Sequence, residues 1–140
     1  MAFWLAHHHP EEYARTVVIG PLRVCARCLG TYPTLFLAIA LQLGLKAPLS
    51  WTLDLPLGVA LLLPALIDWT YGRFRPLSGS NSIRLLSGIL LGLALGRSLY
   101  IHLQRPFPTV LVAQLLVSCA VAGPVLLWTY RPKNTDIDRR

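Results

Sequence analysis

The sequence predicts an all-α integral membrane protein, a bundle of four transmembrane helices with a short cytoplasmic N-terminal cap that carries His and Cys residues. Two features of composition and one of pattern predict this class. Of the 140 residues, 54% are hydrophobic and 14% are charged, whereas soluble domains carry roughly a quarter charged residues. The mean hydropathy is +0.54. The apolar residues are gathered into four long segments with polar breaks between them, as in spanning helices.

The four apolar segments are the expected helices. They cover residues 31–45, 55–71, 83–103 and 107–130. A spanning helix needs about 20 residues, so the third and fourth segments are long enough, the first is short and the second is marginal. Asp54, with Pro56 just inside, predicts the start of the second helix. We therefore divide the chain into three parts: a cytoplasmic cap at 1–30, a transmembrane domain at 31–130 and a cytoplasmic tail at 131–140.

The basic residues predict the orientation. With four spans, the termini and the middle loop share one side of the membrane. That side holds Arg15, Arg23, Arg27, Arg73, Arg75, Arg84, Arg131, Lys133, Arg139 and Arg140. The opposite side holds only Lys46 and Arg105. The positive-inside rule then places both termini in the cytoplasm, for a multi-pass protein of the inner (cytoplasmic) membrane. Because these charges flank apolar runs, the net charge of +7 indicates topology rather than nucleic-acid binding.

A His/Cys element precedes the first helix and predicts a metal site. Cys25 and Cys28 form a Cys-x-x-Cys turn, in which both sulfurs can reach one ion. His7, His8 and His9 lie upstream, close enough for a loop to supply one or two imidazoles. Two thiolates with imidazoles are a ligand set that zinc favours, although another transition metal fits too. The alternative is a pair of reduced or redox-active thiols beside an exposed histidine run.

Three polar residues predict a second feature on the same face. Asp68 ends the second helix, and Asn81 and Arg84 begin the third. Charges near the membrane are costly and are usually paired or functional. Asp68 and Arg84 are expected to pair across the loop, with Asn81 capping the third helix or joining the pair. The alternative is a binding site for a phosphate or carboxylate at that helix start. Arg97, deeper in the third helix, is expected to extend outward toward Tyr100 and His102.

Three glycines of the third helix predict close helix packing. Gly88, Gly92 and Gly96 recur every four residues and form one smooth face. The helix that packs against this face belongs either to this chain or to another subunit, so self-association or contact with other membrane subunits is one expectation for it. No nucleophile–base arrangement, phosphate-binding loop or haem-attachment motif is visible in the sequence.

The stretch Val24-Cys25-Ala26-Arg27-Cys28-Leu29-Gly30-Thr31-Tyr32-Pro33 resembles a family of small prokaryotic membrane proteins, domain-of-unknown-function family twenty eighty-five. Asp68, the Asn81 to Arg84 stretch and Gly88 match later family features, and the resemblance covers about residues 7–100. It implies a multi-helix membrane fold and no established activity. Many members carry a cysteine in the upstream element where this chain has histidines, which implies imidazole in place of one thiolate.

These observations favour a small non-enzymatic membrane protein, an accessory or assembly subunit whose cytoplasmic cap is stabilised by a zinc-like metal. The first alternative is a membrane enzyme or carrier, in which the metal acts with Asp68, Asn81 and Arg84 on an anionic lipid-linked substrate. The second alternative is a subunit that contacts a pigment or a haem through a histidine. The lipid bilayer is a partner under all three hypotheses.

Overall fold

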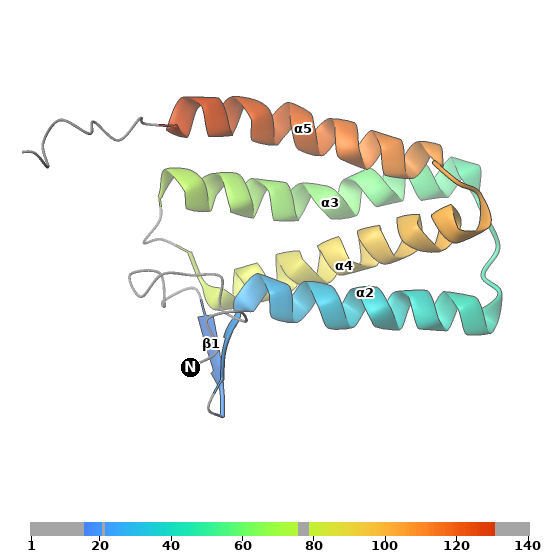
Figure 1. Ribbon diagram of the computed structural model, residues 1–140, viewed down its shortest axis with the longest axis horizontal. Coiled ribbons are helices and arrows are strands. Elements are labelled where there is room, and N and C mark those ends of the chain that lie inside the picture. The colour runs from blue at the N-terminus through green and yellow to red at the C-terminus, as the bar shows by residue number, and fades with distance from the viewer. Residues whose placement is uncertain (1–15, 21, 76–78, 131–140) are drawn as a thin grey trace, which may run out of the picture.

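The computed structural model describes residues 16–20, 22–75 and 79–130, and in this part of the chain four long helices follow a short hairpin (Figure 1). The hairpin pairs β1 (Thr16–Ile19) with β2 (Leu22–Cys25), and the helices are α2 (Ala26–Leu45), α3 (Trp51–Phe74), α4 (Asn81–Gln104) and α5 (Thr109–Thr129). All four are long and apolar enough to cross a membrane. The predicted all-α class and the number of spans are therefore confirmed, whereas the histidines of the cap lie outside the described residues.

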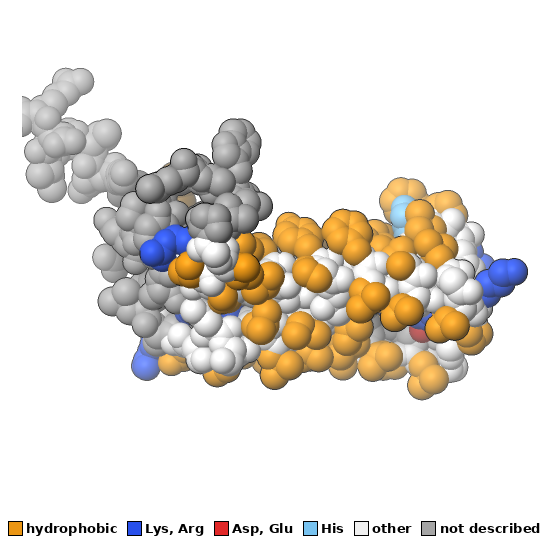
Figure 2. Space-filling view, turned by 90° about the horizontal axis from the view of Figure 1, so that it is seen from below, with side chains coloured by type: hydrophobic (Ala, Val, Ile, Leu, Met, Phe, Trp, Pro, Cys, Tyr) orange, Lys and Arg blue, Asp and Glu red, His pale blue; other side chains and the backbone are white. Residues whose placement is uncertain are grey.

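The helices stand in a row rather than in a closed bundle. Their order is α2, α4, α3, α5; α2 and α4 run in one direction along the row, and α3 and α5 run in the opposite direction (Figure 1). The extensive interfaces are those of α2 with α4, α4 with α3, and α3 with α5. As a result α4 is the most buried helix, and much of the apolar surface of α2 and α5 is exposed. Figure 2 shows the α2 side of the row, where apolar side chains cover the length of the molecule. In a membrane protein this open surface is the part that contacts lipid.

The glycine face of α4 packs against α2 of the same chain. A Cβ atom at Gly88 would lie less than 3.0 Å from the backbone carbonyl oxygen of Arg27, and one at Gly92 would lie that close to the carbonyl oxygen of Thr31. Gly30 of α2 meets the backbone of α4 equally closely in return. The two backbones thus touch, as small residues allow in membrane helices. The two partners expected for this face were a helix of the same chain and a helix of another subunit. The structure places α2 of the same chain on it, so the three glycines are covered and do not form a surface for self-association.

The start of the first spanning helix differs from the prediction. Helix α2 begins at Ala26 rather than at residue 31, and Cys25 is its N-cap residue. Residues 16–25, expected within an irregular cap, form an antiparallel hairpin in which Thr16 pairs with Cys25. The turn uses Gly20 at a positive φ of 59°, which glycine adopts without strain. Short β-branched runs such as Thr16–Ile19 favour strands, but the hydrophobic pattern of so short a segment is too weak to reveal this.

A buried polar contact joins the middle of the row. The side chain of Gln114 on α5 donates through Nε2 to the carbonyl oxygen of Gly58 on α3, at 2.9 Å. Its Oε1 accepts from Ser98 Oγ on α4, at 2.8 Å. Both side chains are almost completely buried. Interhelical hydrogen bonds of this kind stabilise membrane helix packing by about 0.6 kcal/mol on average, and this one ties three of the four helices together.

Candidate functional site

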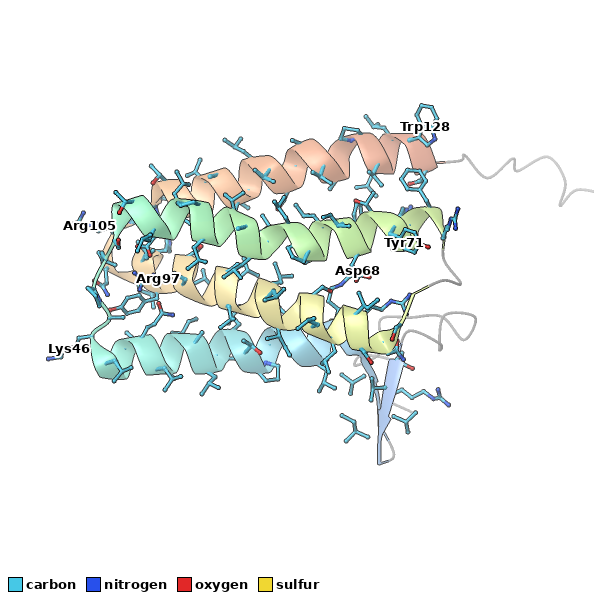
Figure 3. The ribbon with its side chains drawn as sticks, turned by 180° about the vertical axis from the view of Figure 1, so that it is seen from behind. Lys46, Asp68, Tyr71, Arg97, Arg105 and Trp128 are labelled. Atoms are coloured by element: carbon cyan, nitrogen blue, oxygen red, sulfur yellow. The ribbon has the colours of Figure 1, made fainter. Side chains whose placement is uncertain are left out.

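Two clusters of charged and polar side chains lie at opposite ends of the helix row. The Asp68 cluster comprises Arg27, Asp68, Asn81, Arg84 and Ser87, and lies where α2 and α4 begin and α3 ends. The Arg97 cluster comprises Gln42, the Pro48 carbonyl group, Asp54, Arg97 and Tyr100, and lies at the other end. Figure 3 shows Asp68 and Arg97 at these two positions. The predicted site residues Asp68, Asn81 and Arg84 are therefore brought together, and the Arg97 cluster was not predicted.

Asp68 pairs with Arg27, which corrects the expected pair with Arg84. Arg27 Nη2 donates to Asp68 Oδ2 from α2, while Arg84 Nη1 donates to Asn81 Oδ1 at 3.3 Å. The reason is the close approach of α2 to α4, which brings Arg27 beside the end of α3. Ser87 links Asp68 to the backbone of α4, because its Oγ lies 3.3 Å from Asp68 Oδ2 and 3.1 Å from the Arg84 carbonyl oxygen. The Arg84 side chain is 7% exposed, so this cluster holds a buried cation.

Asn81 connects the cluster to the hairpin. Its Nδ2 donates to the carbonyl oxygen of Thr16 at 3.3 Å, while its Oδ1 accepts from Arg84. Ser80, and not Asn81, is the N-cap of α4, because Ser80 Oγ accepts from the backbone N–H of Ser82 at 3.2 Å. The expected capping role of Asn81 is therefore wrong. Asn81 does contact Arg84, but Asp68, the other member of the pair that it was expected to join, is paired with Arg27 instead.

The two cysteines of the Cys-x-x-Cys turn lie at the start of α2, beside the Asp68 cluster. Cys25 is the N-cap residue and Cys28 lies in the first turn. Both are half-buried thiols, and the thiol of Cys28 is within hydrogen-bonding reach of the Cys25 side chain. The predicted ligands His7, His8 and His9 lie outside the described residues. Among the residues described, no group of three or more His, Cys, Asp or Glu side chains is placed to hold a metal ion. The metal site therefore stays a prediction.

The remaining residues of this turn fasten α2 to the row. Ala26 is fully buried, Gly30 touches the α4 backbone, and the Thr31 carbonyl oxygen lies against Gly92 of α4. Arg27 itself carries the ion pair with Asp68. The segment from Cys25 to Thr31 is thus a packing and charge-pairing element as well as a thiol pair. Sequence reasoning missed this because it assigned Arg27 only to the turn.

Each nitrogen of the Arg97 guanidinium donates at least one hydrogen bond within the Arg97 cluster. Arg97 Nε donates to Asp54 Oδ1 at 2.9 Å, and Nη2 donates to Asp54 Oδ2 at 3.1 Å and to the Pro48 carbonyl oxygen at 2.6 Å. Nη1 donates to Gln42 Oε1 at 3.0 Å. The guanidinium also lies 5.6 Å from the ring centroid of Tyr100, as expected, but its main partner is the carboxylate.

Asp54 has a second role in the Arg97 cluster, but it lies in the first turn of α3 and not at the predicted start, because α3 begins at Trp51 with Ser50 as its N-cap residue. Its Oδ2 also accepts from the backbone N–H of Ser50, the N-cap residue, at 2.9 Å. A carboxylate in the first turn interacts favourably with the helix dipole. The sequence does contain a signal for the Arg97–Asp54 pair. Asp54 lies near the start of one span and Arg97 near the end of the next, so the two opposite charges lie at the same end of the helix row.

Comparison with known proteins identifies one family. The family model described as "predicted membrane protein (DUF2085)" matches residues 8–98. The match extends over the hairpin, α2, α3 and most of α4, and so over both polar clusters except Tyr100. No curated protein and no solved structure matches the chain.

Proposed function

Because the chain belongs to the DUF2085 family of predicted membrane proteins, we infer that it is a small non-enzymatic membrane protein, an accessory or assembly subunit. Its N-terminal cap is fastened by a zinc-like metal bound to Cys25 and Cys28 with one or two of His7, His8 and His9. The observation that carries this proposal is the placement of both thiols at the start of α2, within reach of one another. Closed four-ligand sites of Cys and His are the structural type.

The polar clusters support a structural role over a catalytic one. All three nitrogens of Arg97 and both oxygens of Asp54 are engaged within the chain. Asp68 is engaged by Arg27 and Ser87. Charged groups that are paired with one another in this way hold helices together and have little hydrogen-bonding capacity left for a substrate.

Metal analysis tests the proposed cap. Protein purified without metal-affinity resin is expected to contain stoichiometric zinc, and Cys25→Ser and Cys28→Ser are expected to lose it. Cys119→Ser is the matched control, because Cys119 is exposed on α5 and away from the turn. Wild-type protein without zinc or another transition metal contradicts the metal assignment.

Impermeant thiol labelling tests the orientation, in which both termini lie in the cytoplasm of an inner-membrane protein. The end that holds Arg23, Arg73 and Arg75 is the cytoplasmic one by the positive-inside rule. In a cysteine-free background, Lys46→Cys is expected to react from outside the cell and Arg73→Cys only after permeabilisation. The opposite pattern contradicts the orientation.

A second candidate function is supported by one atom of the Asp68 cluster. Arg27 Nε is buried and has no hydrogen-bond partner in the described part of the chain. An unsatisfied buried donor is costly, and an anionic group of a lipid-linked substrate, held by Asn81 and Arg84 beside the metal, would supply a partner. In this case the metal keeps an open position for water.

Metal coordination separates the two candidates. X-ray absorption of the zinc is expected to show four protein ligands for the structural cap, and three protein ligands with one oxygen for the site that acts on a substrate. Arg84→Gln should abolish retention of a polyprenyl phosphate only in the second case. An absorption spectrum with a Soret band would instead favour the pigment- or haem-contacting subunit.

A further inference from the structure

A groove lies along α3 beside α5, separate from both polar clusters. Its volume is about 390 Å³, within the range of small-molecule sites. Five apolar side chains line most of it, with Arg75 at one end: Leu63, Leu66, Ile67 and Phe74 from α3, and Val121 from α5. Ile67 and Phe74 are each more than half exposed, so the groove opens on the surface that faces lipid.

The end of this α3–α5 groove is basic. Arg73 Nε donates to Thr129 Oγ1 at 3.0 Å, which ties the end of α3 to the end of α5. The guanidinium of Arg75 lies 5.9 Å from the ring centroid of Tyr71. Both arginine side chains are exposed. The acidic residue nearby on α3, Asp68, points toward α2 and α4 and is engaged by Arg27, so it does not offset the charge of the groove.

Aromatic residues place this end of the groove at the membrane–water boundary. Tyr71 and Trp128 lie together at this end of the row (Figure 3), and Tyr130 follows α5. All three are exposed. Tyr and Trp gather at the level of the lipid headgroups. The basic end therefore meets headgroups, while the apolar length of the groove meets acyl chains.

One buried polar atom lies in the lining of the groove. Thr70 is a lining residue, and its Oγ1 is buried without a hydrogen-bond partner in the described residues. Apolar neighbours cannot satisfy it. The ester and glycerol oxygens of a phospholipid are acceptors at the depth just below the phosphate.

We propose that the α3–α5 groove binds an anionic phospholipid, with its phosphate against Arg75 and Arg73 and an acyl chain along the apolar lining. Basic pockets between spanning helices recognise anionic headgroups in this way. The site differs from general lipid contact in its selectivity, because two guanidinium groups attract a zwitterionic headgroup less strongly than an anionic one. It does not depend on the metal or on the Asp68 cluster.

Lipid retention tests this site. Full-length protein in detergent is equilibrated with equal amounts of phosphatidylglycerol and phosphatidylcholine, and the bound lipids are quantified by mass spectrometry. The wild-type protein should retain phosphatidylglycerol in preference. Arg75→Gln should lower the ratio of the two lipids about fivefold, since one basic residue near the headgroups contributes about that factor. Arg73→Gln/Arg75→Gln should lower it further.

Two variants keep the test decisive. Arg23→Gln removes an exposed charge from the hairpin at the same end of the row and is expected to leave the ratio unchanged. Val121→Phe fills the groove without a change of charge and should reduce the retention of both lipids. A wild-type ratio near one overturns the proposal, as does an equal loss in Arg23→Gln, which indicates surface charge alone. Unchanged retention in Val121→Phe overturns it too, because the lipid then binds elsewhere.

Discussion

The two polar clusters hold the helix row together by different means. In the Arg97 cluster, hydrogen bonds from one guanidinium join the helices. Nε and Nη2 donate to the Asp54 carboxylate, Nη1 donates to the Gln42 amide oxygen, and Nη2 also donates to the Pro48 carbonyl oxygen. In the Asp68 cluster, the backbones of α2 and α4 are in contact, and this contact positions Arg27 beside Asp68. In the first cluster every nitrogen of Arg97 has a partner, whereas in the second the buried Nε of Arg27 has no hydrogen-bond partner among the residues that the structure describes.

This difference assigns the two clusters different roles: the Arg97 cluster is a clamp that holds helices together, and the Asp68 cluster is a candidate binding site. A network whose charged groups are bonded to one another is rigid and has little capacity left for a ligand. The Asp68 cluster lies beside the two thiols, contains a buried arginine and is joined to the hairpin through Asn81. If the chain binds a metal or an anionic group, the end with spare hydrogen-bonding capacity is the place for it.

The largest effect is expected at the Arg97 cluster. Arg97→Leu leaves the Asp54 carboxylate, only 12% exposed, without its charge partner. Loss of one partner of a buried pair costs 3–5 kcal/mol, and we expect the lower end, about 3 kcal/mol, because both side chains keep some exposure. The free energy of unfolding in detergent micelles measures it.

Two further variants sharpen that result. Lys46→Leu, at the same end but exposed, is expected to change stability by less than about 0.5 kcal/mol. Arg97→Leu with Asp54→Leu should recover part of the loss, because no charge is left unpaired. An equal loss in Lys46→Leu would show that the pair is not the cause.

The next effect is expected where α2 and α4 touch. Gly88→Ala places a methyl group against the Arg27 carbonyl oxygen, so the helices must separate and the Asp68 cluster must shift. Overpacking of this kind costs about 2 kcal/mol. Unfolding measurements check the cost, and the Arg97 cluster should be unaffected.

Gly44→Ala is the matched control for this substitution. It lies on α2, and a Cβ atom there meets nothing within 4 Å. Alanine should therefore be neutral or slightly stabilising at this position. If Gly88→Ala is as well tolerated as Gly44→Ala, the Asp68 cluster is not positioned by backbone contact.

These two clusters also show how far sequence reasoning reaches. Hydropathy and length predict four spans because lipid imposes them on each segment separately. Pairings between segments depend on which helices are neighbours. Asp68 is closer in sequence to Arg84 than to Arg27. Because α2 packs against α4, however, Arg27 lies beside Asp68 and pairs with it. The glycine spacing of α4 predicted that another helix packs closely against it, but not which one. The structure shows that this helix is α2, because α2 is the neighbour of α4 on that side of the row.

A smaller effect should separate the two carboxylates. Asp68→Asn keeps an acceptor for Arg27 and Ser87 and removes the charge. Because Arg27 is 24% exposed and lies near the end of its helix, water solvates part of its charge, and we expect a loss of about 1 kcal/mol. Asp54→Asn should cost about twice as much, since five hydrogen bonds involve that carboxylate and the Arg97 paired with it. Unfolding of both variants under one condition decides the order, and a larger loss for Asp68→Asn reverses the assignment of the clamp.

The smallest effect concerns the hydroxyl that links Asp68 to Arg84. Ser87→Ala removes one hydrogen bond whose proton is shared between two acceptors, and the expected loss is about 0.5 kcal/mol. Gln42→Leu should cost more, about 1 kcal/mol, because it leaves Arg97 Nη1 without its amide partner. Ser82→Ala, on an exposed position one turn earlier than Ser87, is the control and should be neutral. If Ser87→Ala exceeds Gln42→Leu, the Asp68 cluster is the tighter network, and the spare capacity inferred from Arg27 must then be satisfied by a group bound there.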